Sequence, residues 1–184
     1  MSKGTKLRDM IQLIMQDYFR YESGKGLLHF MYRLWRYPAF RILLIFRILQ
    51  GGGKKGLLLK PYYYHLMNKY MIDLPLTVKI GGGCLMPHGG PIVFNLNAVV
   101  GKNATIHPGV LIGGMRGKGV PVIGDNCFIG NGAKIIGNVK IGDWCFICPN
   151  TVVVKDQVPE SVISGIPSKV LNMEGKKNCN LYLK

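Results

Sequence analysis

The sequence predicts a mainly β protein, a narrow prism of stacked coils preceded by a small helical region. Two observations carry this prediction. A β-branched residue returns at every sixth position, at Ile123, Ile129, Ile135, Ile141, Ile147 and Val153. A helix would favour returns at three, four and seven positions and a strand at two, so a period of six indicates an internal repeat. The chain also contains 25 Gly, more than helix bundles tolerate, and glycine suits the turns between short strands.

Each repeat has one large and one small core position. When Ile123 is taken as position one, position five is small or β-branched, at Cys127, Ala133, Val139, Cys145 and Thr151. Three six-residue sides would close one triangular coil of about 18 residues, and stacked coils would pair their strands. The large aliphatic residues would then form ladders inside the prism, with the small position relieving crowding at the corners.

The repeat has two interruptions. Upstream, Ile112, Ile106, Val100 and Phe94 keep the spacing of six, as do Ile80 and Met86. Eight residues separate Met86 from Phe94, around the stretch MPHGGP, and eleven separate Ile112 from Ile123, around the basic, glycine-rich stretch GGMRGKGVP. Polar groups confined to the interruptions of a regular scaffold predict that a functional site is built on those interruptions.

The N-terminal part is strongly basic. Residues 1–72 contain 13 Lys and Arg against 3 acidic residues, within a net charge of +15 for the chain. Residues 26–50 are rich in aromatic residues, and Arg33, Arg36, Arg41 and Arg47 fall on one arc of a helical projection, with Pro38 expected to kink or split the helix. Two interpretations remain open. The segment is either an interfacial helix bound to anionic lipid or a helical cap that packs on the prism or on another subunit.

Composition and the N-terminal stretch favour a cytoplasmic protein, and the lipid-binding interpretation would place it peripherally at the inner face of the membrane. The sequence has neither an uninterrupted apolar run of about 18 residues nor an apolar signal-peptide core. We expect the five Cys to be reduced thiols, and Cys145 of the CxxC stretch falls on the small core position, so no metal site is predicted. Nucleic-acid binding has only the net charge to support it and is not predicted.

Residues 73–171 resemble the hexapeptide-repeat acyltransferases, which fold as left-handed parallel β-helices. The stretch KIGGGCLMPHGGPIVFNLNAVVGKNATIHPGVLIGG resembles the catalytic part of that family, IGNGAKIIGNVKIG its cofactor-side coils, and VISGIPSKVL its closing segment. The likeness is greatest to the serine acetyltransferase type and its polysaccharide-acetylating relatives. The chain then divides into a helical region (1–72), a left-handed β-helix domain (73–171) and a C-terminal tail (172–184).

His88 is the principal candidate for catalysis. It lies in the first interruption between Pro87 and two glycines, which would hold it away from the core, and an imidazole suits proton transfer near neutral pH. The resemblance implies that His88 is the general base for an acceptor hydroxyl and that Asp73 orients it or the acceptor. Asp73 could instead be a surface residue at the entry to the prism. His107 and Asn95 are candidates for acceptor binding, although a solvated His107 is an equal alternative.

The resemblance also implies the co-substrate and the assembly. The co-substrate would be acetyl-CoA, held without a metal in a groove lined by Gly113, Gly114, Gly130, Asn131, Ala133 and Pro149, with Lys169 near the nucleotide phosphates. The family assembles as homotrimers with active sites between subunits, and the same is expected here.

The sequence departs from serine acetyltransferases at the second interruption. Their second His, in an R-H-P context, is replaced by Val120, and the Asp before the catalytic His is replaced by Pro87. These changes favour acetyl transfer from acetyl-CoA to a saccharide hydroxyl of a capsular or exported polysaccharide precursor. Serine O-acetylation is the alternative, and a non-catalytic trimeric scaffold is a third possibility. A zinc hydratase on the same prism would need three His at a spacing that His88 and His107 do not provide.

Overall fold

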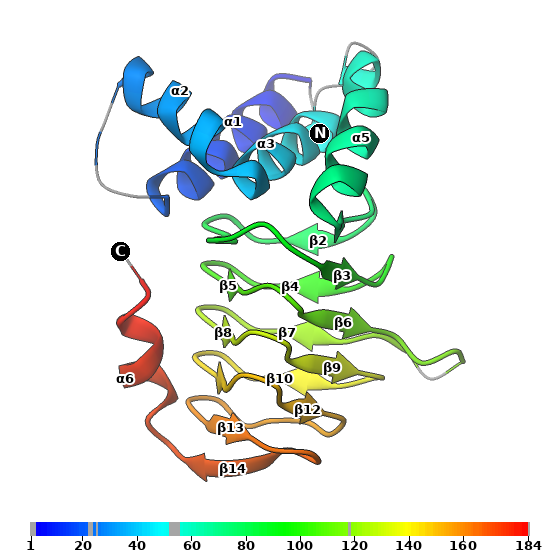
Figure 1. The fold of residues 1–184 in the computed structure, drawn as a ribbon, viewed down its shortest axis with the longest axis vertical. Coiled ribbons are helices and arrows are strands. Elements are labelled where there is room, and N and C mark those ends of the chain that lie inside the picture. The colour runs from blue at the N-terminus through cyan, green and yellow to red at the C-terminus, as the bar shows by residue number, and fades with distance from the viewer. Residues whose placement is uncertain (1–2, 22–23, 25, 52–55, 118, 184) are drawn as a thin grey trace.

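The computed structural model describes residues 3–21, 24, 26–51, 56–117 and 119–183. A helical region caps one end of a parallel β-solenoid (Figure 1). The helices are α1 (Lys3–Phe19), α2 (Leu27–Arg36), α3 (Pro38–Gly51), the 3-10 helix η1 (Leu57–Leu59), α5 (Lys60–Tyr70) and, after the solenoid, α6 (Gly175–Asn180). The predicted fold class, mainly β with a small helical region in front, is therefore confirmed.

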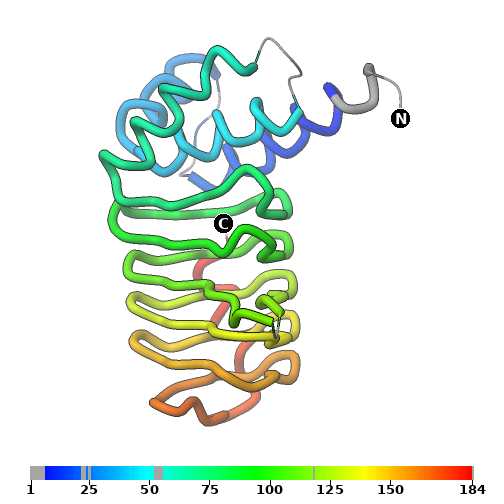
Figure 2. Tube along the Cα trace, turned by 90° about the vertical axis from the view of Figure 1, so that its right-hand side faces the viewer, coloured from blue at the N-terminus to red at the C-terminus, as the bar shows by residue number. Residues whose placement is uncertain are grey.

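The solenoid has three faces. Face A contains β1 (Ile72–Asp73), β3 (Ile92–Phe94), β6 (Leu111–Gly113), β9 (Lys134–Ile136) and β12 (Val152–Val153). Face B contains β2 (Lys79–Ile80), β4 (Val99–Val100), β7 (Val122–Ile123) and β10 (Lys140–Ile141). Face C contains β5 (Thr105–Ile106), β8 (Phe128–Ile129), β11 (Phe146–Ile147), β13 (Val162–Ser164) and the antiparallel β14 (Lys169–Asn172). Figure 2 shows the coils stacked one above another.

The strand register confirms the predicted coil. Ile129 pairs with Ile147 and Ile123 with Ile141, both one uninterrupted coil apart. The ladders also stay in register across the second interruption, where Val100 pairs with Ile123. That insertion leaves the prism after β6 and returns before β7, with an antiparallel bridge between Met115 and Gly119 (Figure 1). The predicted large and small core positions are buried along the whole prism.

The glycine at position two of the repeat is needed for close stacking of the coils. A Cβ atom on Gly130 would lie 2.7 Å from the backbone nitrogen of Pro149 in the next coil, well inside van der Waals contact. Gly130 does not have a positive φ, whereas position four of the repeat does, at Asn126, Gly132, Trp144 and Asn150. The sharp bend therefore lies two residues after the glycine. The glycine is required because the backbone of the next coil lies too close for a Cβ atom.

The helical region packs directly on the first coil. Pro38 splits the expected helix, since α2 ends at Arg36 and α3 begins at Pro38. Side chains along α3, among them Ile42, Leu43 and Phe46, are buried in the same core cluster as the solenoid. This arrangement confirms the cap interpretation for α3.

Two of the four arginines that share one arc of the helical projection are buried, although a polar arc on an amphipathic helix normally faces solvent. Arg33 is 1% exposed and Arg47 is 2% exposed. Arg33 donates a hydrogen bond to the carbonyl oxygen of Tyr21 and lies over the ring of Tyr18. The projection was wrong for these residues because it represents one helix alone and cannot show backbone carbonyl groups brought close by other parts of the chain.

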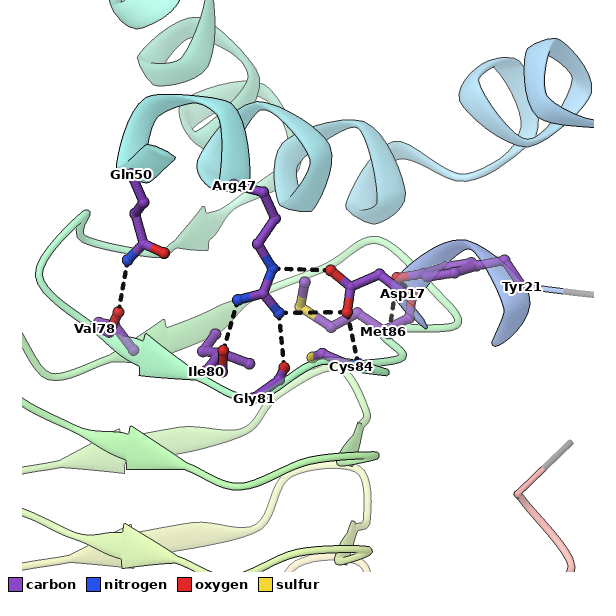
Figure 3. Close-up of polar contacts among 9 residues, drawn as sticks. All are labelled: Asp17, Tyr21, Arg47, Gln50, Val78, Ile80, Gly81, Cys84 and Met86. Carbon is purple, nitrogen blue, oxygen red and sulfur yellow. Dashed lines mark hydrogen bonds and ion pairs between the residues drawn. The ribbon is translucent and has the colours of Figure 1, made fainter. Parts of the chain in front are cut away.

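Side chains of the helical region form hydrogen bonds with the unpaired backbone groups at the open edge of the first coil (Figure 3). Arg47 donates hydrogen bonds to the carbonyl oxygens of Ile80 (2.6 Å) and Gly81 (2.7 Å). Arg20 donates to the carbonyl oxygen of Gly83. The remaining contacts along this edge join the Gln50 amide to the Val78 carbonyl, the Asp17 carboxylate to the Cys84 N–H and the Tyr21 hydroxyl to the Met86 N–H.

Arg47 and Asp17 also form a buried ion pair. The Nε atom of Arg47 lies 2.9 Å from Oδ2 of Asp17. Burial raises the pKa of the Asp17 carboxyl above its ordinary value, and the charge of Arg47 opposes that rise. The charged form of Asp17 therefore depends on its partner.

The C-terminal tail runs back along face C toward the cap (Figure 1). Cys179 of α6 is buried against the backbone of Trp144 and Cys145. The Tyr182 ring packs on Phe128 at a centroid distance of 4.2 Å, and its carbonyl oxygen accepts a hydrogen bond from Arg20. The tail is thus fastened to both the solenoid and the helical region. Within the described residues, none of the helices has the length and apolar character needed to cross a membrane.

We predict that Arg47→Met lowers the free energy of unfolding by about 3–5 kcal/mol, because it leaves the Asp17 carboxyl buried without its partner. The pKa of Asp17 would rise further in the variant. A carboxyl with a raised pKa in the folded state stabilises the protein below the unfolded-state pKa and loses that contribution as pH rises. The deficit relative to the wild type should therefore grow from about pH 4 toward neutral pH. Urea denaturation across this range measures it.

The control for Arg47→Met is Lys177→Ala, which removes the exposed ion pair between Lys177 and Glu174. Exposed pairs contribute little to stability, so this variant should unfold like the wild type. A deficit in Arg47→Met that stays constant with pH would contradict the assigned role of Asp17.

We also predict that two glycines of the solenoid respond differently to alanine. Gly130→Ala should destabilise the protein by about 1–3 kcal/mol, because the new methyl group meets the backbone of the next coil. Gly113→Ala should unfold within about 0.5 kcal/mol of the wild type, because its Cβ would meet nothing closer than a Leu111 side-chain atom at 3.5 Å. Denaturation curves at equal protein concentration test the pair, and equal losses would refute the stacking argument.

Candidate active site

A groove on face A brings together four of the residues predicted for the site. It encloses about 510 Å³, and its lining includes Asp73, Asn95, Gly113 and Gly114. These residues come from the successive coils of β1, β3 and β6, which pair in register along face A. Because side chains alternate along a strand, Asp73 and Val93 point outward while Ile72 and Ile92 enter the core. Leu111 and Ile136 complete apolar walls around the single carboxylate.

The projecting loop returns beside this groove at Val120. A Cβ atom on Gly114 would lie 2.8 Å from Nδ2 of Asn95 and 2.9 Å from Cγ1 of Val120. Asn95 itself is held by the N–H of Asn97, which donates to its Oδ1 atom at 3.1 Å. The glycine therefore lets the Asn95 amide and the Val120 side chain approach the groove closely.

His88 and His107 lie together at the corner where face C leads into face A. Their ring centroids are 6.1 Å apart. His88 is exposed on the first interruption, as predicted, whereas His107 is half-buried. The His107 ring also packs on Phe128 at 4.9 Å and lies edge-on to Tyr182 at 6.5 Å. The C-terminal tail thus contributes to the wall of this corner.

The environment of His107 favours its neutral form. Burial lowers the pKa of His107, the nearby His88 lowers it further, and a hydrogen bond with the Asn131 side chain partly opposes both effects. Its Nε2 atom is buried and has no hydrogen-bond partner among the described residues. A buried polar atom without a partner is rare in folded proteins, so this nitrogen is available to a ligand.

The predicted site residues therefore fall into two groups within one chain. His88, His107 and Asn131 share the corner, and Asp73, Asn95, Gly113 and Gly114 share the groove. Among the described residues no hydrogen bond joins Asp73 to His88, and His88 is not part of the groove lining. The expected contact between this carboxylate and the imidazole is thus not present in the isolated chain.

The other residues predicted for the co-substrate have different environments. Gly130 and Ala133 are buried, and the Ala133 side chain fills the small core position, so only its backbone could contact a ligand. Pro149 and Asn131 are exposed at the same corner in successive coils, where the Asn150 N–H donates to the Asn131 carbonyl oxygen. Lys169 is exposed on β14 at the far end of the solenoid.

Two features of the site were not found from the sequence. Phe128 and Tyr182, which flank His107, are 54 residues apart, and only the folded tail brings them together. The groove walls at Val93 and Leu111 occupy outward strand positions, which the repeat pattern leaves unassigned. A signal was present in the aromatic residues at outward positions of face C, where Phe128 stacks on Phe146 at 4.4 Å. In the part of the chain that the structure describes, no cluster of His, Cys, Asp or Glu is suited to hold a metal ion.

Comparison with known proteins agrees with this architecture. Residues 121–155 match the family described as bacterial transferase hexapeptide (six repeats). The chain is 28% identical to a serine acetyltransferase of Synechococcus elongatus over 144 residues, which are 76% of this chain and 59% of the relative. It is 37% identical to a serine acetyltransferase of Staphylococcus aureus over 107 residues, which are 56% of this chain and 50% of the relative. The chain thus spans between half and three fifths of these relatives.

The fold is also similar to that of solved structures. The crystal structure of Neisseria gonorrhoeae serine acetyltransferase in complex with serine superposes with a TM-score of 0.76 and 26% identity, covering 92% of this chain and 72% of the other. The helical region is included in that coverage, so the likeness extends beyond the repeats. The chain therefore contains a hexapeptide-repeat solenoid, and it is similar in sequence and in fold to serine acetyltransferases.

Proposed function

We propose that this chain is an acetyl-CoA-dependent O-acetyltransferase in which His88 is the general base. One observation carries the proposal. An exposed imidazole projects from the first interruption of the solenoid, beside a second imidazole with an unpartnered Nε2 atom. The similarity to serine acetyltransferases over both the helices and the solenoid supports acetyl transfer as the reaction.

The proposed reaction needs one proton acceptor close to the hydroxyl group. His88 takes the proton of the acceptor hydroxyl as its oxygen attacks the acetyl thioester carbonyl. The carbon–sulfur bond then breaks, and the imidazolium returns the proton to the departing thiolate. The partner-free Nε2 atom of His107 is suited to hold the acceptor beside His88, because the neutral form of His107 is favoured.

The groove on face A suits the extended arm of acetyl-CoA. Its walls at Val93, Leu111 and Ile136 are apolar, and the backbone is accessible at Gly113 and Gly114. An amide-rich, flexible chain can bind such a surface through peptide groups and aliphatic contacts. Asn131, Pro149 and Lys169 remain candidates for the rest of the co-substrate, whereas the burial of Gly130 favours a packing role.

We further propose a homotrimer with its active sites between subunits. The separation of the His88 corner from the Asp73 groove supports this arrangement, because a neighbouring prism could bring one group to face the other. Sedimentation velocity should give three chains per particle, and a catalytically active monomer would exclude the arrangement.

Two acceptors are candidates. The comparisons support a serine hydroxyl, the alternative acceptor in the sequence analysis, better than a saccharide hydroxyl. A specific observation nevertheless favours an uncharged acceptor. On its groove side the acceptor would face Asp73, the single charged residue among those described as lining the groove, and Val120, which offers no donor to a carboxylate. A saccharide hydroxyl therefore remains the second candidate.

We predict that His88→Ala lowers turnover by about 10²–10⁴-fold, which is the usual contribution of a positioned base. The residue lies outside the hexad ladders, so folding and acetyl-CoA affinity should be retained. Thiol release from acetyl-CoA measures turnover, and isothermal titration measures affinity. His65→Ala is the matched control, because His65 is exposed on α5 and stacks on Tyr62. Near wild-type turnover of His88→Ala would remove His88 from the mechanism.

The acceptor is tested with serine and with a panel of nucleotide sugars and oligosaccharides, using labelled acetyl-CoA. If serine is the acceptor, Val120→His should raise kcat/KM for serine by about tenfold or more, since a hydrogen bond to a charged group contributes about 1.5–3 kcal/mol. Val120→Leu is the control for side-chain size. Unchanged serine kinetics in Val120→His, together with faster acetylation of a saccharide by the wild type, would decide for the saccharide.

A further inference from the structure

Helix α2 has two apolar faces, and only one of them is covered. On the inner side Phe30 and Leu34 pack against the cluster of Tyr18, Tyr21 and Phe40. On the outer side Leu28, Met31, Tyr32 and Trp35 follow the i, i+3, i+4, i+7 spacing of one helix face, and Leu28 is 81% and Trp35 74% exposed. A helix that is apolar on both sides is normally buried on both. The outer side of α2 therefore needs a partner.

A second element at the same end of the molecule also exposes apolar side chains. Leu57 and Leu58 of η1 are exposed, Leu58 by 86%. Figures 1 and 2 both place α2 and the start of α5, which follows η1, at the end of the molecule farthest from β14. We call the exposed apolar side chains at this end the cap face, formed by Leu27, Leu28, Met31, Tyr32, Trp35, Leu57 and Leu58.

The charge of the helical region that carries the cap face distinguishes between possible partners. Apart from the buried Arg20, Arg33, Arg47 and Asp17, residues 1–72 contain ten Lys and Arg against two acidic residues. Helix α2 carries an exposed Arg36 and no acidic residue. Two copies meeting through this end would bring like charges together, whereas an anionic surface would be attracted to it.

We propose that the cap face binds the surface of an anionic phospholipid bilayer. The apolar side chains of α2 and η1 would enter the boundary between headgroups and acyl chains, as in interfacial amphipathic helices. Tyr32 and Trp35, whose rings are 6.3 Å apart, are the residue types that prefer this boundary. The cationic groups around them would contact the lipid phosphates. The chain would lie on the membrane with its solenoid directed away from it.

The first experiment measures co-sedimentation of the full chain with vesicles. We expect binding to phosphatidylcholine vesicles that contain phosphatidylglycerol, and much weaker binding to phosphatidylcholine alone. Added salt should weaken the binding, because exposed charges are screened over about 8 Å at physiological ionic strength. Absence of binding to the anionic vesicles at low salt would overturn the proposal.

The second experiment places the contact at α2. Trp35→Ser should weaken vesicle partitioning by about tenfold or more, since the variant no longer buries a large apolar side chain in the bilayer. The matched control is Leu171→Ser, because Leu171 is 62% exposed on β14 at the opposite end. Circular dichroism checks that both variants fold. Equal partitioning of Trp35→Ser and the wild type would overturn the assignment.

Fluorescence gives an independent readout, because the chain contains only two Trp, Trp35 and Trp144. Brominated lipids should quench the wild type and leave the emission of Trp35→Phe, which reports Trp144 in the solenoid, unchanged. Sedimentation velocity without lipid tests whether a second copy of the chain covers the cap face instead. A dimer of assemblies that Trp35→Ser dissociates would show that a second copy covers the cap face, and would overturn the proposal. None of these measurements involves acetyl transfer, so they stand apart from the proposed activity.

Discussion

The solenoid depends on how its first coil is closed. Every inner strand finds a neighbour above and below, but the upper edge of the first coil has no strand to pair with. Arg47 and Arg20 donate to its carbonyl oxygens, and Asp17 and Tyr21 accept from its N–H groups. An open row of such groups would recruit other chains. The helical region therefore replaces a missing strand, and the buried Arg47–Asp17 pair joins α3 to α1, directly after which Arg20 and Tyr21 lie.

Closure at this end has a consequence for the site. His88 lies in the coil that begins immediately below the cap, since the Met86 N–H two residues earlier is held by Tyr21. The next coil pairs with this one through Leu85 and Thr105, which sets His107 beside His88. Arg20 contacts the same region through Gly83, Thr105 and the tail carbonyl of Tyr182. Backbone register and Arg20, which directly follows α1, thus hold the region that carries the two imidazoles.

The solenoid could be predicted well from the sequence because its repeat is set by residues only six positions apart. A side chain six residues away occupies an equivalent place in the prism, so the aliphatic ladders and both interruptions could be found by counting. The site was only partly predictable, because its groups meet through stacking. His88 and its exposure followed from the interruption, whereas the packing of Tyr182 beside His107 needed the folded tail. Arg33 and Arg47 were misplaced for a related reason, since their partners are carbonyl groups that have no signature in the sequence.

The misplaced arginines change what the high net charge means. Arg20, Arg33 and Arg47 are buried donors to carbonyl oxygens and contribute to closing the fold. Their charge is therefore held inside the protein and is of little use for attracting an external anion. A count of basic residues overstates the electrostatic surface of this end, and the exposed apolar side chains of α2 matter correspondingly more. Attraction by the remaining Lys and Arg would concentrate the chain at an anionic surface, and insertion of Trp35 and its neighbours would supply the affinity that screened surface charge lacks.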